Sequence, residues 1–135
     1  MIEEIQNEIS QYIEKRAMGV NDPWEQLIIG CVAFVERAID KDVMKILLID
    51  GPAAIPWQDW KKLDSQNSEN HLKYQLKKLH TAGMIKDINL EHLTSFISGG
   101  LNELAVGISL NSLNETDDPG DIEDIVRSML AGVKK

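Results

Sequence analysis

The chain has 135 residues, which suits one domain with a single hydrophobic core. Hydrophobic residues make up 43% of it and charged residues 27%, as in ordinary globular proteins. The formal net charge is −8, which disfavours binding to nucleic acid because the phosphate backbone is negative as well. The basic residues between positions 61 and 80 are interleaved with apolar residues at helical spacing, so we interpret them as the solvated side of helices.

The chain carries no signal for export or membrane insertion. Its single cysteine, Cys31, excludes an intrachain disulfide and suits a reducing compartment. The N-terminus is acidic and amphipathic, unlike a signal peptide, and no apolar stretch is long enough to span a bilayer. We therefore expect a cytoplasmic protein that does not contact a membrane.

The spacing of apolar residues over positions 1–19 predicts an amphipathic helix that ends near Gly19. Its apolar stripe consists of Ile2, Ile5, Ile9, Tyr12 and Ile13. No Ser, Thr, Asp or Asn precedes Ile2 to cap the helix, so its start resembles the middle of a longer helix.

Asp22 and Pro23 predict the start of a second, long helix, because a capping side chain is followed by proline at the first helical position. Apolar residues occupy most positions up to about Ile39. This pattern predicts a central helix that is buried on most sides. Cys31 lies within the apolar stripe, and we interpret it as a core or pocket residue and not as a nucleophile.

The middle of the chain predicts two short helices and a longer one. Asp40 can cap an apolar helix that stops at residues 50–52, Asp-Gly-Pro. A second helical period starts after Pro56 and contains two tryptophans one turn apart. The polar residues 64–70 interrupt the period, which then resumes in a helix that ends at Gly83.

Asn89 can cap the next helix, whose interior contains Gly99, Gly100 and Gly107. Each glycine costs about 1 kcal/mol relative to alanine inside a helix. Close approach by another helix is the usual compensation, so we expect this side of the helix to be packed. An acidic loop over 114–120 precedes a last helix with apolar residues at i, i+3, i+4 and i+7.

No segment alternates apolar and polar residues over the length of a strand, and no internal repeat is present. The chain is therefore predicted to be all-α, a bundle of about six helices in one domain that covers residues 1–135.

No cluster of residues in the sequence predicts catalysis or metal binding. His71, His80 and His92 are far apart, and no second cysteine accompanies Cys31. The acidic residues between 117 and 124 lack the spacing of a calcium loop. No phosphate-binding loop, carboxylate pair or nucleophilic triad can be proposed. We therefore expect no enzymatic activity, no cofactor and no metal site.

Residues 45–64, KILLIDGPAAIPWQDWKKLD, resemble the effector-binding domain of tetracycline-repressor-type (TetR-type) transcriptional regulators. The resemblance rests on the Asp-Gly-Pro turn after an apolar helix, on the two tryptophans, and on the order of helices over essentially the whole chain. Pro56 departs from the pattern, in which glycine precedes the first tryptophan, so a different local turn is expected. The sequence contains no segment like the helix-turn-helix domain of the family, and we expect this to account for the acidic charge and residues 1–19 to be the remnant of a connecting helix.

The resemblance implies an apolar cavity that binds a small, mostly apolar effector. Ordinary core packing is the alternative for every residue proposed to line it. Asp50 either caps the turn at Gly51, which is favoured, or anchors a ligand. The residues that we expect to line the cavity are Trp24, Ile28, Cys31, Phe34, Leu47, Ile55, Trp57, Trp60, Leu76, Phe96 and Asn102, with Glu103 as a second polar candidate.

The resemblance also implies a homodimer in which the last two helices of each subunit form a four-helix bundle about a twofold axis. The expected glycines would let the helix backbones approach closely. The residues that we expect in this interface are Gly100, Leu101, Leu104, Gly107, Ile108, Ile122, Ile125, Val126 and Met129.

The leading hypothesis is the ligand-sensing and dimerisation domain of a TetR-type repressor. Its effector would shift the helix that ends at Gly19 and so change the spacing of two DNA-binding domains, while this chain itself binds no nucleic acid. The alternative is a truncated, stand-alone domain that pairs with a full-length regulator or another protein through the last two helices. A third hypothesis is an enzyme or carrier that uses the pocket differently.

Overall fold

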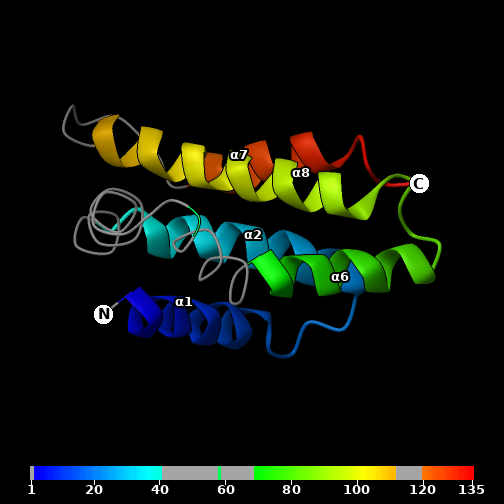
Figure 1. Ribbon diagram of the computed structural model, residues 1–135, viewed down its shortest axis with the longest axis horizontal. Coiled ribbons are helices and arrows are strands. Elements are labelled where there is room, and N and C mark those ends of the chain that lie inside the picture. The colour runs from blue at the N-terminus through cyan, green and yellow to red at the C-terminus, as the bar shows by residue number, and fades with distance from the viewer. Residues whose placement is uncertain (1, 41–57, 59–68, 112–119) are drawn as a thin grey trace.

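The computed structural model describes residues 2–40, 58, 69–111 and 120–135. These residues form five helices, labelled as in Figure 1, which confirms the all-α prediction. The predicted short helix after Asp40, the tryptophan pair and the acidic loop lie outside the described residues. The five helices are α1 (Ile2–Ala17), α2 (Pro23–Ala38), α6 (Asn70–Thr81), α7 (Leu90–Asn111) and α8 (Gly120–Leu130).

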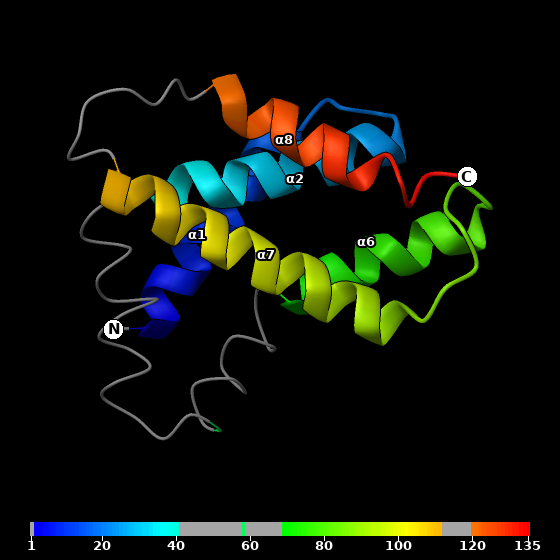
Figure 2. The same cartoon turned by 90° about the horizontal axis from the view of Figure 1, so that it is seen from above.

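The described helices lie in three layers. Figure 1 shows α1 on one side, α2 and α6 in the middle, and α7 and α8 on the opposite side. Figure 2 looks onto the outer layer, where α7 and α8 run in opposite directions. Helix α2 contacts α1, α6, α7 and α8 and is the central helix, as its apolar sequence predicts.

The core is built around α2. Nine of its 16 residues are buried, and Ile28 and Val35 are completely inaccessible. Each neighbouring helix adds residues from one stripe, because a helix of a globular protein buries one face. These residues are Ile9 from α1, Leu76 and Leu79 from α6, Ile97 and Ala105 from α7, and Ile122, Val126 and Leu130 from α8.

Two predicted helix caps are present in different forms. Asn89 caps α7 with its side chain, because its Oδ1 accepts a hydrogen bond from the backbone N–H of His92 at 3.0 Å. Asp22 occupies the N-cap position of α2 with extended backbone angles, but its side chain makes no capping hydrogen bond. Instead its backbone carbonyl accepts the N–H of Gln26 at 2.9 Å. Gly19 and Gly83 adopt positive φ angles where the chain leaves α1 and α6.

The expectation that another helix covers the glycines of α7 is wrong within one chain. A Cβ atom added to Gly99, Gly100 or Gly107 would meet no atom within 4 Å outside the surrounding α7 backbone. Gly99 and Gly100 are exposed to solvent. Gly99 and Gly100 therefore lie on a face of α7 that no other described part of the chain covers, whereas Gly107 is partly buried.

The end of the chain is fastened to the link between α6 and α7. Ile85 and Lys134 form an isolated antiparallel bridge, in which the N–H of Lys86 donates to Val133 and the N–H of Lys135 donates to Met84. The Lys134 ammonium also lies 5.2 Å from the centre of the Trp24 ring, a cation–π distance. The residues after α8 thus join the start of α2 to the link between α6 and α7.

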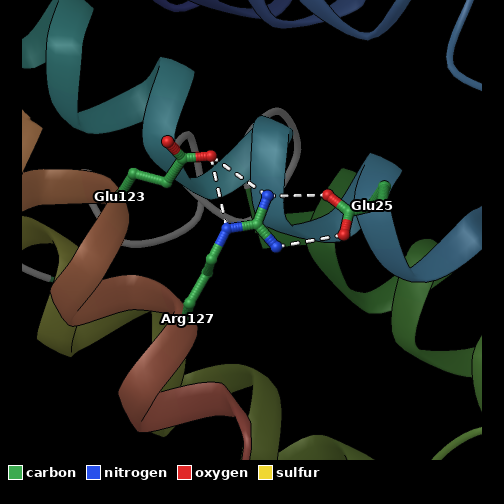
Figure 3. A network of polar contacts seen from close by, with 3 residues as sticks. All are labelled: Glu25, Glu123 and Arg127. Carbon is green, nitrogen blue, oxygen red and sulfur yellow. Dashed lines mark hydrogen bonds and ion pairs between the residues drawn. The ribbon is translucent and has the colours of Figure 1, made fainter.

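Arg127 connects α8 to the first turn of α2 (Figure 3). Its Nη1 and Nη2 atoms donate to the two carboxylate oxygens of Glu25 at 3.0 and 2.7 Å. Its Nη2 and Nε atoms also donate to Glu123, one turn earlier on α8. The hydrogen bonds from Arg127 lower the pKa of the Glu25 carboxyl below its ordinary value.

Replacing Arg127 by methionine should lower the free energy of unfolding by less than about 1 kcal/mol, because both charged side chains are more than a third exposed and solvent screens the pair. The measurement is urea unfolding of Arg127→Met, Glu25→Gln and the double variant at neutral pH, which gives the coupling energy of the pair. A coupling energy of zero would contradict a role of the pair in fastening α8 to α2.

The same pair should contribute to the pH dependence of stability. Because the pKa of Glu25 is lowered by folding, its contribution is complete above the ordinary pKa of glutamate and is lost as the pH falls through the lowered folded value. In Glu25→Gln the loss of stability on acidification should be smaller than in the parent. If the two proteins lose the same amount of stability on acidification, the interaction between Glu25 and Arg127 is contradicted.

Candidate functional site

A cavity of about 240 Å³ lies among α1, α2, α6 and α7. Its walls are mostly apolar, and polar side chains from all four helices also reach it. The lining residues are Ile13, Glu14, Ala17, Gln26, Leu27, Gly30, Cys31, Phe34, His71, Leu72, Tyr74, Gln75, Ser98 and Leu101.

Helix α2 supplies the largest part of the apolar wall. Leu27, Cys31 and Phe34 follow one another at i, i+4 and i+7, so they lie on one side of the helix. All three are buried. Gly30 lies one residue before Cys31 and carries no side chain, so α1 can lie near the α2 backbone here. A Cβ atom at Gly30 would lie 3.6 Å from the Cγ2 of Ile13 on α1, which is ordinary van der Waals contact.

Polar groups reach the cavity at two depths. Within the described part of the chain, Gln75 Oε1 is buried without a hydrogen-bond partner, which costs free energy. The amide nitrogen of Gln26 donates to the backbone oxygen of Val20 at 2.6 Å. Glu14, His71 and Tyr74 are exposed and therefore form the rim. The cavity thus combines an apolar interior with a small number of hydrogen-bonding groups, as small-molecule sites do.

Cys31 forms part of the cavity wall, but its thiol is not an activated nucleophile. Burial raises the pKa of its thiol to about 12, because the apolar surroundings disfavour the thiolate. At neutral pH the side chain is a neutral thiol, which packs as a small apolar group.

The histidines of the described residues do not lie in a metal-binding cluster. Within residues 2–40, 69–111 and 120–135, no group of three or more His, Cys, Asp and Glu side chains is placed to hold an ion. His80 forms a pair with Asp87 at 3.0 Å on the surface, whereas His71 lies at the rim of the cavity.

The residues expected to bind a ligand separate into four groups. Cys31 and Phe34 line the cavity. Trp24, Ile28 and Leu76 are buried in the core and do not line it. Phe96 is 77% exposed, and Asn102 is half-buried on α7 away from the lining. Four further positions lie outside the described residues: Leu47, Ile55, Trp57 and Trp60.

Several lining residues were not among the expected ones, and they include the buried Ser98 and the half-buried Gln75. Thr94, Ser98 and Leu101 follow the stripe of α7 that faces the interior. The Thr94 hydroxyl donates to the backbone oxygen of Leu90 at 2.6 Å, whereas Ser98 lines the cavity. Gln75 similarly lies beside the buried Leu76 on α6. In the sequence, Gln75 and Ser98 occupy positions where the helical pattern of α6 and α7 calls for apolar residues, and this was the signal that could have identified them as cavity residues.

Helices α7 and α8 present an outer face that turns away from α2. Figure 1 shows both helices on the same side of α2, and each of them has exposed apolar residues. Phe96 is 77% exposed, Met129 63% and Ile125 43%, although apolar side chains of this size are usually covered. We call this surface the outer α7/α8 face; its residues are Phe96, Gly99, Gly100, Glu103, Ile125 and Met129.

The residues expected in the dimer interface lie on both sides of these two helices. Gly100, Ile125 and Met129 belong to the outer α7/α8 face. Ile122 and Val126 are buried against the core of the same chain, and Leu101 lines the cavity. The remaining three are partly buried on α7: Leu104, Gly107 and Ile108.

Comparison with known proteins gives a family for the chain. Among the described residues no helix combines the length and apolar character that crossing a membrane requires. No curated protein matches the sequence. A family model described as "Tetracyclin repressor-like, C-terminal domain" matches residues 24–133, which include nearly all of α2 and the whole of α6, α7 and α8. With this match over most of its length and an all-helical fold, the chain belongs to the family of tetracycline-repressor-like C-terminal domains.

Proposed function

We propose that this chain is the ligand-sensing and dimerisation domain of a TetR-type transcriptional repressor, and that its effector binds in the cavity between α1, α2, α6 and α7. The observation that carries the proposal is a mostly apolar cavity, with polar side chains in its wall, in a member of this regulator family. Such a combination suits the binding of a small molecule.

The size and walls of the cavity favour a small, mostly apolar effector. Its volume of about 240 Å³ is slightly below the range of about 300–1,000 Å³ that is typical of pockets for drug-sized ligands. Leu27, Cys31 and Phe34 offer apolar contact. An effector in this position would displace water from these side chains, which is the main favourable contribution to its binding.

The cavity also gives the effector direct access to α1. Ile13, Glu14 and Ala17 line it from the C-terminal half of that helix. On its outer side α1 is held to α2 by ion pairs of Arg16 with Glu36 and of Glu8 with Arg37. An effector that contacts one position of α1 better than another would shift the equilibrium between them. In the proposed regulator this shift passes to DNA-binding domains that precede α1.

A second copy of the chain is the proposed partner of the outer α7/α8 face. Phe96 and Met129 supply exposed apolar surface on the two helices. Gly99 and Gly100 leave the α7 backbone open to close approach. Two such faces related by a twofold axis would form a four-helix bundle.

The proposal includes no catalytic step. The family is one of regulators, and the thiol in the cavity wall is neutral at physiological pH because burial raises its pKa to about 12. A regulator of transcription acts in the cytoplasm, where a lone thiol such as Cys31 stays reduced.

Effector binding should protect Cys31 from chemical modification. A ligand that binds only the conformation in which Cys31 is buried should slow modification of the thiol about 100-fold when its concentration is about 100 times its Kd. The measurement combines a thermal-shift screen of small apolar compounds with the rate at which a maleimide modifies the thiol in the presence of each stabilising compound.

A filled cavity provides the control for this experiment. Ala17 lines the cavity, so Ala17→Phe should lower the affinity of every true effector at least about 10-fold, because the new ring takes the space of the ligand. Ala82→Phe places the same ring at an exposed position outside the cavity and should leave binding unchanged. Stabilising compounds that neither protect Cys31 nor respond to Ala17→Phe would exclude this cavity as the effector site.

Glutamate on the outer α7/α8 face should dissociate the dimer. Phe96→Glu and Met129→Glu would each bury a charge without a partner, and we expect the dimer dissociation constant to rise at least about 30-fold. Light scattering coupled to size-exclusion chromatography over a range of concentrations measures this. The matched control is Met18→Glu, because Met18 is 79% exposed and directly follows α1, the helix that Figure 1 shows on the other side of α2 from α7 and α8. Equal dissociation constants for all three variants would contradict a dimer through this face.

Alanine at Gly100 should stabilise the single chain and weaken the dimer. In one chain the new methyl group meets no atom within 4 Å outside the neighbouring α7 backbone, and alanine is favoured over glycine in a helix by about 1 kcal/mol. In the proposed dimer the same methyl group would separate two closely packed helices. Urea unfolding in the Met129→Glu background and the dissociation constant in the parent background measure the two effects. A Gly100→Ala protein that dimerises more tightly would contradict close packing at this glycine.

A further inference from the structure

Ser98 is a buried polar residue whose hydroxyl is not used within the described part of the chain. Thr94 and Ser98 are the two buried polar residues among those that the structure describes, and they are 2% and 9% exposed. Both lie on α7, one turn apart. The Thr94 hydroxyl donates to the backbone oxygen of Leu90, whereas the Ser98 hydroxyl makes no hydrogen bond with a described residue. Because buried polar groups are usually paired, a partner from outside the chain is expected for Ser98.

The Ser98 hydroxyl can be reached from the cavity. Its side chain forms part of the cavity wall on α7. The Oγ atom keeps accessible surface, unlike Gln75 Oε1, which is enclosed by protein and cannot meet a ligand. A serine inside a helix can donate to the carbonyl four residues earlier, as Thr94 does, but Ser98 does not. The hydroxyl is therefore available to a molecule in the cavity, both as a donor and as an acceptor.

The inner part of the cavity carries no charge. The buried lining residues among those described are Leu27, Cys31, Phe34 and Ser98. All of them are neutral at physiological pH, because burial raises the pKa of the one titratable group, the Cys31 thiol, to about 12. The ionisable side chains of Glu14, His71 and Tyr74 are exposed and belong to the rim. A charged ligand group beside Ser98 would therefore lose its water without gaining a counter-charge, which is unfavourable.

A purely apolar ligand would also suit this wall poorly. Water that enters the cavity can hydrogen-bond with the Ser98 hydroxyl, but an apolar group in the same place displaces that water and leaves the hydroxyl unpaired. A ligand group that forms its own hydrogen bond replaces the water. One hydrogen bond of this kind changes the affinity of a ligand by about 5-fold.

We propose that the effector is uncharged and carries a hydroxyl or carbonyl group that hydrogen-bonds with Ser98 at the α7 wall of the cavity. This inference rests on the proposed function of the cavity and adds the chemical class of its ligand. The apolar part of the effector would lie against Leu27, Cys31 and Phe34. A small alcohol, ketone or ester satisfies these walls, whereas a carboxylate, an amine or a hydrocarbon of the same size does not.

Four probes with one apolar body separate these ligand classes: para-butylbenzyl alcohol, para-butyltoluene, para-butylbenzoate and para-butylbenzylamine. Their affinities for the full chain are measured by calorimetric titration at about pH 7, where the benzoate is an anion and the amine a cation. The alcohol should bind at least about 10-fold more tightly than either charged probe, because only the charged groups lose a strong hydration. A charged probe that binds more tightly than the alcohol would overturn the uncharged class.

Ser98→Ala assigns the preference to the hydroxyl. The dissociation constant of the alcohol divided by that of para-butyltoluene should rise about 5-fold in the variant, because only the alcohol loses a hydrogen bond. Taking the ratio within each protein cancels a general change in the affinity of the cavity. The matched control is Ser95→Ala, which removes a hydroxyl from an exposed position of α7 outside the cavity and should leave the ratio unchanged.

The same two variants test whether the hydroxyl has a partner in the free protein. Alanine is favoured over serine inside a helix, so each variant should raise the melting temperature by about 2 °C. Both are measured in the Met129→Glu background, so that a change in dimerisation does not contribute. A lower melting temperature for Ser98→Ala alone would show that its hydroxyl forms a hydrogen bond within the protein, and would overturn the proposal.

The outcomes distinguish this inference from the proposed function. If the alcohol and para-butyltoluene bind and protect Cys31, but Ser98→Ala leaves the ratio of their dissociation constants unchanged, the cavity is a ligand site and the assigned class is wrong. If none of the four probes binds the parent protein or protects Cys31, the cavity is not a site for ligands of this size, and both proposals fail.

Discussion

The structure depends on the burial of α2 on nearly all its sides. A helix surrounded by α1, α6, α7 and α8 must be apolar around most of its circumference, and this explains the unusual density of apolar residues between Trp24 and Ile39. Its charged residues lie near the two ends, where the other helices do not close over them. There each charge has a partner: Glu25 binds Arg127, Glu36 binds Arg16, and Arg37 binds Glu8. The same helix is therefore both the core of the domain and the point at which the other helices are fastened.

The cavity follows from the small side chains on one side of this helix. Gly30 lets α1 lie close to the α2 backbone, whereas Cys31 occupies a position where leucine or phenylalanine would take up more of the space among α1, α6 and α7. Because α2 is held by contacts on its other sides, the surrounding helices do not close the space beside Cys31. A rigid central helix with small residues at one place can thus keep a cavity open, and the stability of the domain does not depend on filling it.

The sequence predicted the fold better than the site. The bounds of α2 and the all-α class followed from apolar periodicity and from Asp22-Pro23, since these are local features of one helix. The identity of cavity residues depends on how several helices pack together, and periodicity cannot separate a residue that faces a cavity from one that faces the core. Ile28 and Cys31 share the apolar side of α2, for example, but only Cys31 lines the cavity. Phe96 illustrates the same limit of periodicity: it was expected to line the cavity, but its side chain is exposed to solvent.

The position of α8 in the chain has a consequence for synthesis. Helix α2 is made before α8, and the residues of α8 that cover it, Ile122, Val126 and Leu130, emerge from the ribosome about a hundred residues later, since chains are made in one direction at about 5–20 residues per second. The bridge between Ile85 and Lys134 closes at the same late stage. Throughout that interval the nascent chain holds a strongly apolar helix that is only partly sheltered, mainly by α1, with which it can pair first because the two are adjacent in sequence. Helix α1 therefore serves the newborn polypeptide as a temporary cover as well as the mature domain as a wall of its cavity.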